Sequence, residues 1–324
     1  MTHLLEVKNL EVSFRSGKEV FTGASDVSFH VDKGEILCIV GESGSGKSIT
    51  TLSLMGLLGK NGRVDKGSIL FDGEELFGKK EKELDNIRGS KITMIFQDAL
   101  TSLNPVFTIG NQMLEAIQSH SKSSKKEAEE KAKYLLGKVG LSDTEALLQK
   151  YPHTLSGGMR QRVMIAMALA GEPKLLIADE PTTALDVTIQ AQIMELLKSL
   201  NKELAMSVIL ITHDMGVVAE MADRVLVMYA GEVVEEAPVK VLFHNPGHPY
   251  TKALLRSIPG VRKEEEEKLV PIEGSVPEEY DRIRGCRFAN RCAFAEEACS
   301  LPQKLRQAED EMAHSIRCWK YEKL

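Results

Sequence analysis

The sequence lacks a hydrophobic run long enough to cross a membrane. Its longest strongly apolar run, residues 163–170, is far shorter than the ~20 residues of a membrane helix. Charged side chains at Glu6, Lys8 and Glu11 also interrupt the N-terminus before the apolar core of a secretory signal could form. We therefore expect a soluble protein that reaches a membrane only through a partner.

An excess of positive charge is also absent. The formal net charge is −6 at pH 7, which argues against a general nucleic-acid binder, so no nucleic-acid partner is expected. The 324 residues are 43% apolar, enough for a sizeable core and long for a single domain. One large and one small domain are therefore expected.

Cysteine is scarce until the end of the chain. With no sign of a secretory leader, we expect a reducing compartment, in which thiols bind metals or stay free instead of forming disulfides. Cys38 lies in an apolar run and is most simply a small buried hydrophobe. The other four, separated by five, six and eighteen residues, are Cys286, Cys292, Cys299 and Cys318. Four thiolates can complete a metal site, but this spacing matches neither a zinc ribbon nor a ferredoxin run, so it leaves the metal open.

What the sequence does contain is a complete phosphate-binding loop. The segment GESGSGKS fits the pattern G-x-x-x-x-G-K-[ST], follows the apolar run 35–40 and precedes a helix-like stretch at 47–58. Its glycines let backbone N–H groups surround phosphate oxygens, while the lysine neutralises charge and the last serine offers a hydroxyl to Mg²⁺. A nucleoside triphosphate is the expected ligand. The loop consists of Gly41, Glu42, Ser43, Gly44, Ser45, Gly46, Lys47 and Ser48.

Further motifs follow in a fixed order. LSGGMRQ occupies residues 155–161, LLIADEP residues 175–181, ALD residues 184–186, and ITHD residues 211–214, with Gln97 placed after an apolar strand. Together with the phosphate loop, these segments resemble the motifs of ABC ATPases, in their order and spacing, over about residues 4–235. The resemblance implies ATP as the nucleotide and Mg²⁺ as its metal.

The resemblance also implies a role for each polar residue of these motifs. Asp179 would bind Mg²⁺ directly or through water, together with Ser48, and Glu180 would be the general base for the attacking water. Gln97 would ligate Mg²⁺ and touch that water, and His213 would contact the γ-phosphate. These groups supply the positioning and charge stabilisation that phosphoryl transfer needs.

Two further assignments concern an aromatic residue that also has a structural reading and a segment that needs a second subunit. Phe14 is the family's candidate for stacking on adenine, although Phe14 or Phe21 could equally be a core residue.

The LSGGMRQ segment places a second set of backbone N–H groups before a helix. The phosphate loop of the same subunit already covers the nucleotide of that subunit, so these N–H groups have no phosphate of their own to bind. In ABC ATPases a head-to-tail dimer solves this, because each subunit completes the other's site with the residues that correspond here to Ser156, Gly157 and Gly158.

The pattern predicts an α/β fold: a P-loop NTPase of the ABC ATPase type with an antiparallel β lobe, an inserted helical subdomain and a small Cys-rich C-terminal extension. Alternation at residues 4–14 and 24–31 predicts the β lobe, and strands are also expected at 67–72 and 91–97. Short apolar runs at 174–178, 207–212 and 224–228 alternate with helical stretches at 187–204 and 215–222, as in a parallel α/β core.

The expected domain bounds are residues 1–250 for the ATP-binding domain, with a helical subdomain at about 98–170, and 251–324 for the extension. Residues 108–150, rich in Ala, Glu, Lys and Leu, are expected to be helical. The charged run KEEEEK at residues 263–268 is expected to be a solvated linker or an exposed helix.

The flanking segments resemble the ATPase subunits of oligopeptide/dipeptide ABC importers. They are QDALTSLNP at residues 97–105, NPGHPYT at 245–251, GSVP at 274–277 and CRFANRC at 286–292. The resemblance implies a chain that powers import from the cytoplasmic face of the cell membrane, as a peripheral subunit. Its implied partners are a second ATPase subunit (a sister chain or itself), two membrane-spanning permease subunits and an extracytoplasmic solute-binding protein.

The same resemblance implies a [4Fe-4S] cluster on the four C-terminal cysteines, with structural zinc or unfilled thiols as alternatives. Nickel or another small solute is an alternative cargo. A soluble ABC ATPase of translation or repair is an alternative function, but such proteins usually carry two cassettes or long insertions, which this sequence lacks.

Overall fold

The structure is a computed structural model, and it describes residues 3–97, 102–183, 185–257, 272–308 and 313–321. Two compact units make up the chain: unit 1 comprises residues 1–78 and 211–324, and unit 2 comprises residues 79–210. Each unit is described by itself. The linker expected at 263–268, the segment 98–101 and Ala184 lie outside the described residues.

Unit 1 contains the antiparallel β lobe that alternation predicted. Its sheet has the order β2-β1-β4-β5, in which β1 pairs with both β2 and β4. Leu5 and Val7 are buried on β1 while Glu6 is half-buried and Lys8 is exposed, which is the two-residue period of a half-buried strand, and the register shifts before buried Leu10. The strands are β1 (Leu5–Ser16), β2 (Glu19–Val31), β4 (Gly62–Phe71) and β5 (Glu74–Glu75).

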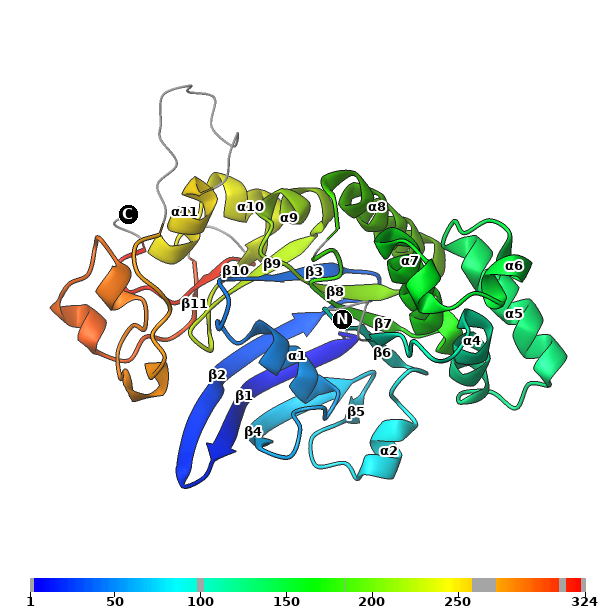
Figure 1. The fold of residues 1–324 in the computed structure, drawn as a ribbon. Helices are drawn as coiled ribbons and strands as arrows, with labels where there is room; N and C mark the ends of the chain where they lie inside the picture. Colours follow the sequence, from blue (N-terminus) through cyan, green and yellow to red (C-terminus); the bar gives the residue numbers. More distant parts are fainter. Residues whose placement is uncertain (1–2, 98–101, 184, 258–271, 309–312, 322–324) are drawn as a thin grey trace. The chain divides into compact units, whose positions relative to one another are not determined.

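The rest of unit 1 is a mixed sheet with helices beside it. The central strand β3 (Ile36–Val40) is fully buried and pairs in parallel with β9 (Arg224–Tyr229), and the order in this unit is β11-β12-β10-β9-β3. Helix α1 (Lys47–Leu54) lies against the antiparallel sheet (Figure 1). The remaining elements are β10 (Glu232–Pro238), β11 (Arg306–Gln307), β12 (Ser315–Ile316), α9 (Met215–Met221), α10 (Val239–His244), α11 (Pro249–Arg256), η3 (Tyr280–Arg282), η4 (Ala289–Arg291) and η5 (Glu297–Ser300).

Unit 2 combines three strands with a group of helices. The strand order is β8-β7-β6, and β6 pairs with β7 in parallel, as expected of an α/β core. Figure 1 shows α4 to α7 gathered in green and blue-green. The elements are β6 (Ile92–Ile95), β7 (Leu175–Asp179), β8 (Ser207–Ile211), α2 (Glu81–Asp85), α4 (Ile109–Gln118), α5 (Lys125–Lys138), α6 (Thr144–Leu148), η1 (Pro152–Thr154), α7 (Gly157–Ala168), η2 (Leu169–Gly171) and α8 (Val187–Leu204).

Side-chain caps decide where the helices of unit 2 begin. The region 108–150 divides into three helices, because Thr108, Ser124 and Asp143 each accept a hydrogen bond from the first turn that follows. Strand β6 is shorter than the expected 91–97 and ends at Ile95, so Gln97 lies on the loop beyond it. The domain boundary expected at residue 250 stays a prediction.

Buried Glu235 ties the C-terminal segment to β10. Its carboxylate accepts backbone hydrogen bonds from Gly247 (2.6 Å) and His248 (2.8 Å), and lies 2.8 Å from Nε2 of His314. His248 also caps α11, because its Nδ1 accepts the N–H of Tyr250. Burial lowers the pKa of His248 to about 4, opposed by the charge of Glu235 and assisted by that of Arg317.

This buried histidine makes the stability of the fold depend on pH. The unfolded chain protonates the side chain below about pH 6.5, while the folded chain does so only near pH 4. The free energy of unfolding should therefore fall as the pH drops through this window, by up to about 1.4 kcal/mol per pH unit. His248→Asn keeps a side-chain acceptor for the helix cap and removes the titrating imidazole. The free energy of unfolding should then depend less steeply on pH.

Urea unfolding at neutral and mildly acidic pH measures this difference. His244→Asn, at the exposed end of α10, serves as the control and should keep the wild-type dependence. An equally steep dependence in His248→Asn would contradict this explanation.

Candidate functional site

The phosphate-binding loop of unit 1 has a backbone that only glycine can follow. Gly41, Gly44 and Gly46 have positive φ angles of 151°, 79° and 98°. A Cβ at Gly41 would lie 2.2 Å from the carbonyl oxygen of Met228, and one at Gly46 would lie 2.9 Å from that of Gly23. The loop is therefore held against neighbouring strands, and its glycines are required by close contact as well as by conformation.

Lys47 points back into this loop. Its Nζ donates hydrogen bonds to the carbonyl oxygens of Gly41 (2.8 Å) and Glu42 (2.9 Å), and the residue is only 6% exposed. The β9–β10 turn supports the loop from outside, since Gly231 donates its N–H to the carbonyl of Ser45 (2.9 Å). Ser48, half-buried, follows Lys47 on the first turn of α1. A cation is thus fixed at the loop, as phosphate binding requires.

Two residues that the motifs did not indicate also hold the loop. Tyr250 accepts the backbone N–H of Glu42 at its hydroxyl (2.8 Å), and Arg291 forms a two-pronged ion pair with the Glu42 carboxylate. Both lie in segments singled out by sequence, GHPYT and CRFANRC, but neither segment showed that its target was the phosphate loop.

Unit 2 brings Gln97 and Glu180 together. The carboxylate of Glu180 accepts hydrogen bonds from Nε2 of Gln97 (2.9 Å) and from the hydroxyl of Thr183 (3.0 Å). Asp179 is the last residue of β7 and is 7% exposed. Glu180 has a φ of 46°, a left-handed conformation that is uncommon for glutamate. Such backbone conformations cluster at functional sites, and this one occurs at the residue whose carboxylate binds the Gln97 amide.

The LSGGMRQ segment forms the N-terminus of the twelve-residue helix α7. Ser156 is the cap residue, because its hydroxyl accepts the N–H of Met159 (3.3 Å). Ser156 and Gly157 are exposed, while a Cβ at Gly158 would lie 2.8 Å from Ile189 of α8. Packing on α8 therefore explains the second glycine, and exposure leaves the cap residue and the first glycine accessible to another molecule.

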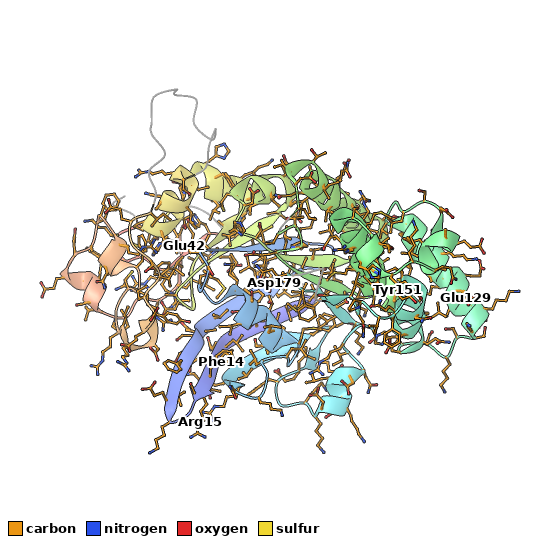
Figure 2. The ribbon with its side chains drawn as sticks, in the orientation of Figure 1. Phe14, Arg15, Glu42, Glu129, Tyr151 and Asp179 are labelled. Atoms are coloured by element: carbon orange, nitrogen blue, oxygen red, sulfur yellow. The ribbon has the colours of Figure 1, made fainter. Side chains whose placement is uncertain are left out.

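His213 and Phe14 belong to unit 1. His213 is exposed between β8 and α9. Phe14, labelled on β1 in Figure 2, is half-buried and pairs across the strands with Phe21, which is 39% exposed. Its ring lies so close to Gly62 that a Cβ there would come within 2.7 Å. Phe14 packs closely against Gly62 and is also partly exposed, so its adenine-stacking role stays a prediction.

The four C-terminal cysteines surround one cavity in unit 1. Phe288, Phe294 and Trp319 line it as well, so the sulfur atoms face mainly apolar neighbours. One sulfur, that of Cys299, accepts hydrogen bonds from the indole N–H of Trp319 (3.3 Å) and the backbone N–H of Glu296 (3.5 Å). The cysteines that line the cavity are Cys286, Cys292, Cys299 and Cys318.

Burial shifts the thiols of Cys286, Cys292 and Cys318 toward their protonated form. Burial raises the pKa of Cys286 to about 12, and it also raises the pKa values of Cys292 and Cys318. In each of the three, a hydrogen bond from the backbone N–H two residues later acts in the opposite direction and favours the thiolate. A metal that binds here must therefore displace protons, and its affinity should rise with pH.

The spacing of the sulfur atoms bears on which metal would fit. In the described residues, no three cysteine sulfurs lie within 4.8 Å of one another. A single zinc ion holds four sulfurs at ~2.3 Å, which places them about 3.8 Å apart. The sulfurs are thus not grouped as a single-ion site requires, and the four cysteines leave zinc and an iron–sulfur cluster both open.

Comparison with known proteins places these sites in one class. Residues 24–183 match the family model "ABC transporter", and residues 234–299 match "Oligopeptide/dipeptide transporter, C-terminal region". The P-loop, the antiparallel sheet and the mixed sheet are those of an ABC ATPase. The chain belongs to the family of ABC transporter ATP-binding proteins that carry this oligopeptide/dipeptide C-terminal region.

Named relatives match over nearly the full length. The chain is 52% identical to the oligopeptide transport ATP-binding protein AppD of Bacillus subtilis, covering 99% of this chain and 98% of the relative. It is 50% identical to the dipeptide transport ATP-binding protein DppD of Haemophilus influenzae, covering 96% and 92%. A dimeric post-hydrolysis structure of the ATP-binding cassette MJ0796 with ADP and Pi matches with a TM-score of 0.64 and 32% identity, over 72% of this chain and 98% of that one.

None of the described helices is both long and apolar enough to span a lipid bilayer.

The geometry of Lys47 predicts its contribution to ATP binding. Hydrogen bonds to charged groups contribute about 1.5–3 kcal/mol, so Lys47→Ala should weaken ATP binding about ten- to a hundredfold. Displacement of a fluorescent ATP analogue from the purified chain measures the affinity. Lys60→Ala removes an equal charge at an exposed position and should have little effect. Equal affinities in the wild type and Lys47→Ala would refute the phosphate-binding assignment.

Proposed function

We propose that this chain binds and hydrolyses ATP and thereby powers an ABC importer of oligopeptides or dipeptides. The observation that carries the proposal is the glycine loop with Lys47 directed into it, in a chain about half identical to AppD and DppD over nearly its whole length. A translation or repair ATPase is not favoured, because the C-terminal region of peptide transporters is present. The printed names of these relatives favour peptides over nickel as the cargo.

The chain would work in an assembly at the cytoplasmic face of the cell membrane. Its partners would be a second ATPase subunit, which is a sister chain or another copy, two membrane-spanning permease subunits and, through them, an extracytoplasmic solute-binding protein. The dimeric cassettes among the related structures support the pairing of two ATPases. The exposed cap residue Ser156 and its neighbour Gly157 would face the nucleotide of the opposite subunit, with Gly158 behind them.

Residues of about 98–170 would form the helical subdomain, and it would dock on the permeases. Val106 is 71% exposed and Phe107 is 48% exposed, both unusually high for apolar side chains in a folded unit. Phe107 and Leu114 line an open groove along α4. Residues 251–324 would form the Cys-rich C-terminal extension.

Proton transfer, phosphate binding and adenine binding would each use particular residues of these motifs. Glu180 would accept the proton of the attacking water at its carboxylate. Gln97 is hydrogen-bonded to that carboxylate and would orient both the carboxylate and the water. Lys47 and the loop N–H groups would bind the phosphates, and His213 would contact the γ-phosphate. Phe14 would stack on the adenine.

The oxygen donors of Ser48, Gln97 and Asp179 suit Mg²⁺, a hard cation that prefers oxygen ligands. When bound, Mg²⁺ supplies charge neutralisation to the phosphates of ATP. Asp179 is the last residue of the fully buried strand β7 and is 7% exposed.

The cysteine-lined cavity would hold a [4Fe-4S] cluster. Four cysteines around one apolar cavity offer the four thiolate ligands that such a cluster takes, with structural zinc as the alternative. When bound, the cluster supplies four iron–thiolate bonds that hold together a lobe with few large apolar groups. The hydrogen bonds from Trp319 and Glu296 would hold the Cys299 sulfur in place for the cluster.

Replacing the proposed general base tests the enzymatic part. Glu180→Gln keeps the shape and the contact with Gln97 but cannot accept the proton, so hydrolysis by the assembled transporter should fall about 100- to 10,000-fold with ATP binding retained. Phosphate release and peptide uptake by transporter in vesicles measure both consequences. Glu195→Gln, exposed on α8, is the matched control. Hydrolysis within twofold of the wild type would remove Glu180 from this role.

Anaerobic purification tests the metal. The protein should be brown, with broad absorbance near about 400 nm and equal amounts of iron and sulfide. Cys292→Ser and Cys299→Ser should lose the colour, while Cys38→Ser, in buried strand β3, should keep it. Colourless protein with one zinc per chain would replace the cluster with a structural zinc site, and protein without metal would leave the cavity as free thiols.

A further inference from the structure

We infer that Arg291 is a positioning residue for the phosphate-binding loop, and that it couples the cysteine-lined cavity to ATP binding. The inference rests on the proposed ATP-binding function and adds a control element to it. Arg291 lies next to Cys292 in the sequence and contacts Glu42, the second residue of the loop, from 249 positions away.

The guanidinium of Arg291 has an acceptor for every N–H that it carries. Nη1 donates to one carboxylate oxygen of Glu42 (2.7 Å) and Nη2 donates to the other (3.0 Å). The remaining N–H groups reach the hydroxyl of Tyr229 (3.3 Å) and the backbone carbonyls of Glu273 (2.8 Å), Gly274 (3.2 Å) and Ile272 (3.4 Å). This fork geometry is specific to arginine, because lysine has no planar pair of donors to match a carboxylate.

Burial adds to the rigidity of this pair. The Arg291 side chain is 6% exposed and that of Glu42 is 29% exposed, so solvent screens the pair only in part. The hydrogen bonds to Glu42 raise the pKa of Arg291 further above its usual range. The charge on Arg291 is therefore permanent, and it keeps the Glu42 carboxylate in one orientation.

Every polar group of Glu42 is held in place. Its carboxylate binds Arg291, its backbone N–H donates to the hydroxyl of Tyr250 (2.8 Å), and its carbonyl accepts from Nζ of Lys47 (2.9 Å). The last contact connects the pair to the lysine that binds phosphate. Figure 2 labels Glu42 on unit 1, where these C-terminal contacts reach the loop. If Arg291 moves, the Glu42 carbonyl and the position of Lys47 should change with it.

An aromatic cluster connects the same contacts to the cysteine cavity. Phe288 lines the cavity and is 3% exposed, and its ring packs edge-on against Tyr229 at 5.2 Å and beside Tyr250 at 5.3 Å. The guanidinium of Arg291 lies 5.9 Å from the Phe288 ring and 5.7 Å from the Tyr229 ring. The single turn η4 (Ala289–Arg291) joins Phe288 to Cys292, so one short segment carries both Arg291 and a cysteine of the cavity.

The consequence is that filling the cavity should tighten ATP binding. A lobe ordered by its metal presents Arg291 to Glu42, and a lobe without metal loses that alignment. The effect should fall mainly on nucleotide affinity, because Arg291 and Glu42 act through the position of Lys47, which binds the phosphates. Couplings of this kind commonly change affinity about five- to a hundredfold.

Arg291→Lys and Glu42→Gln test the positioning role in the full chain with its metal. Each should weaken the binding of a fluorescent ATP analogue about five- to fiftyfold, with iron content and melting temperature close to the wild type. The double variant should be no weaker than either single variant, since both changes break one contact. Arg282→Ala, in an exposed pair with Glu279, is the control and should leave ATP affinity unchanged.

Kinetics of the assembled transporter separate positioning from a general structural role. In Arg291→Lys, KM for ATP should rise while kcat at saturating ATP stays near the wild type. Cys292→Ser should weaken ATP binding to a similar extent, and adding Arg291→Lys to it should have little further effect.

ATP affinity within twofold of the wild type in Arg291→Lys, or additive losses in the double variant with Glu42→Gln, would overturn the inference. Failure of the wild-type chain to bind ATP would instead refute the proposed function itself.

Discussion

Much of the structure depends on one close approach, where the backbone of Gly41 passes the carbonyl oxygen of Met228. Glycine alone fits there, because a Cβ would lie 2.2 Å from that oxygen. The approach requires β9 beside β3, which are paired in parallel although nearly two hundred residues separate them. The hydrogen bond from Gly231 to Ser45 depends on this pairing, because Gly231 follows β9. The loop is thus shaped by tertiary packing as much as by its own sequence.

The sequence predicted the bounds of an element correctly where the residues that start and end that element lie beside it in the chain. The expected bounds of α8 (Val187–Leu204) agree with the structure, since Asp186 caps its start and Ala205 ends it in a left-handed conformation. Strand β4 was expected from residue 67 but begins at Gly62, because pairing of Gly62 with Phe14 extends it. A partner strand elsewhere in the chain is not visible to a local pattern.

The candidate site also divides into residues that a local pattern predicts and residues that only the fold brings together. The phosphate loop could be named from its own pattern, and Asp179 and Glu180 from the resemblance of the motif order to ABC ATPases, because each motif is short and continuous. The fork from Arg291 to Glu42 could not, since neither residue carries a local signal for a partner 249 positions away. The left-handed φ of Glu180 was likewise invisible, because that conformation is set by the fold around the end of β7.

The distance along the chain between Glu42 and Arg291 also has a consequence for biosynthesis. A ribosome adding ~5–20 residues per second needs about 12–50 s to pass from one to the other. During that interval the glycine loop and α1 have already been translated, but the arginine that holds Glu42 has not. β12 (Ser315–Ile316), which pairs with β10, arrives later still. The nascent chain therefore lacks the contact that fixes Glu42 until Arg291 has been translated, which should limit ATP binding by shorter nascent chains.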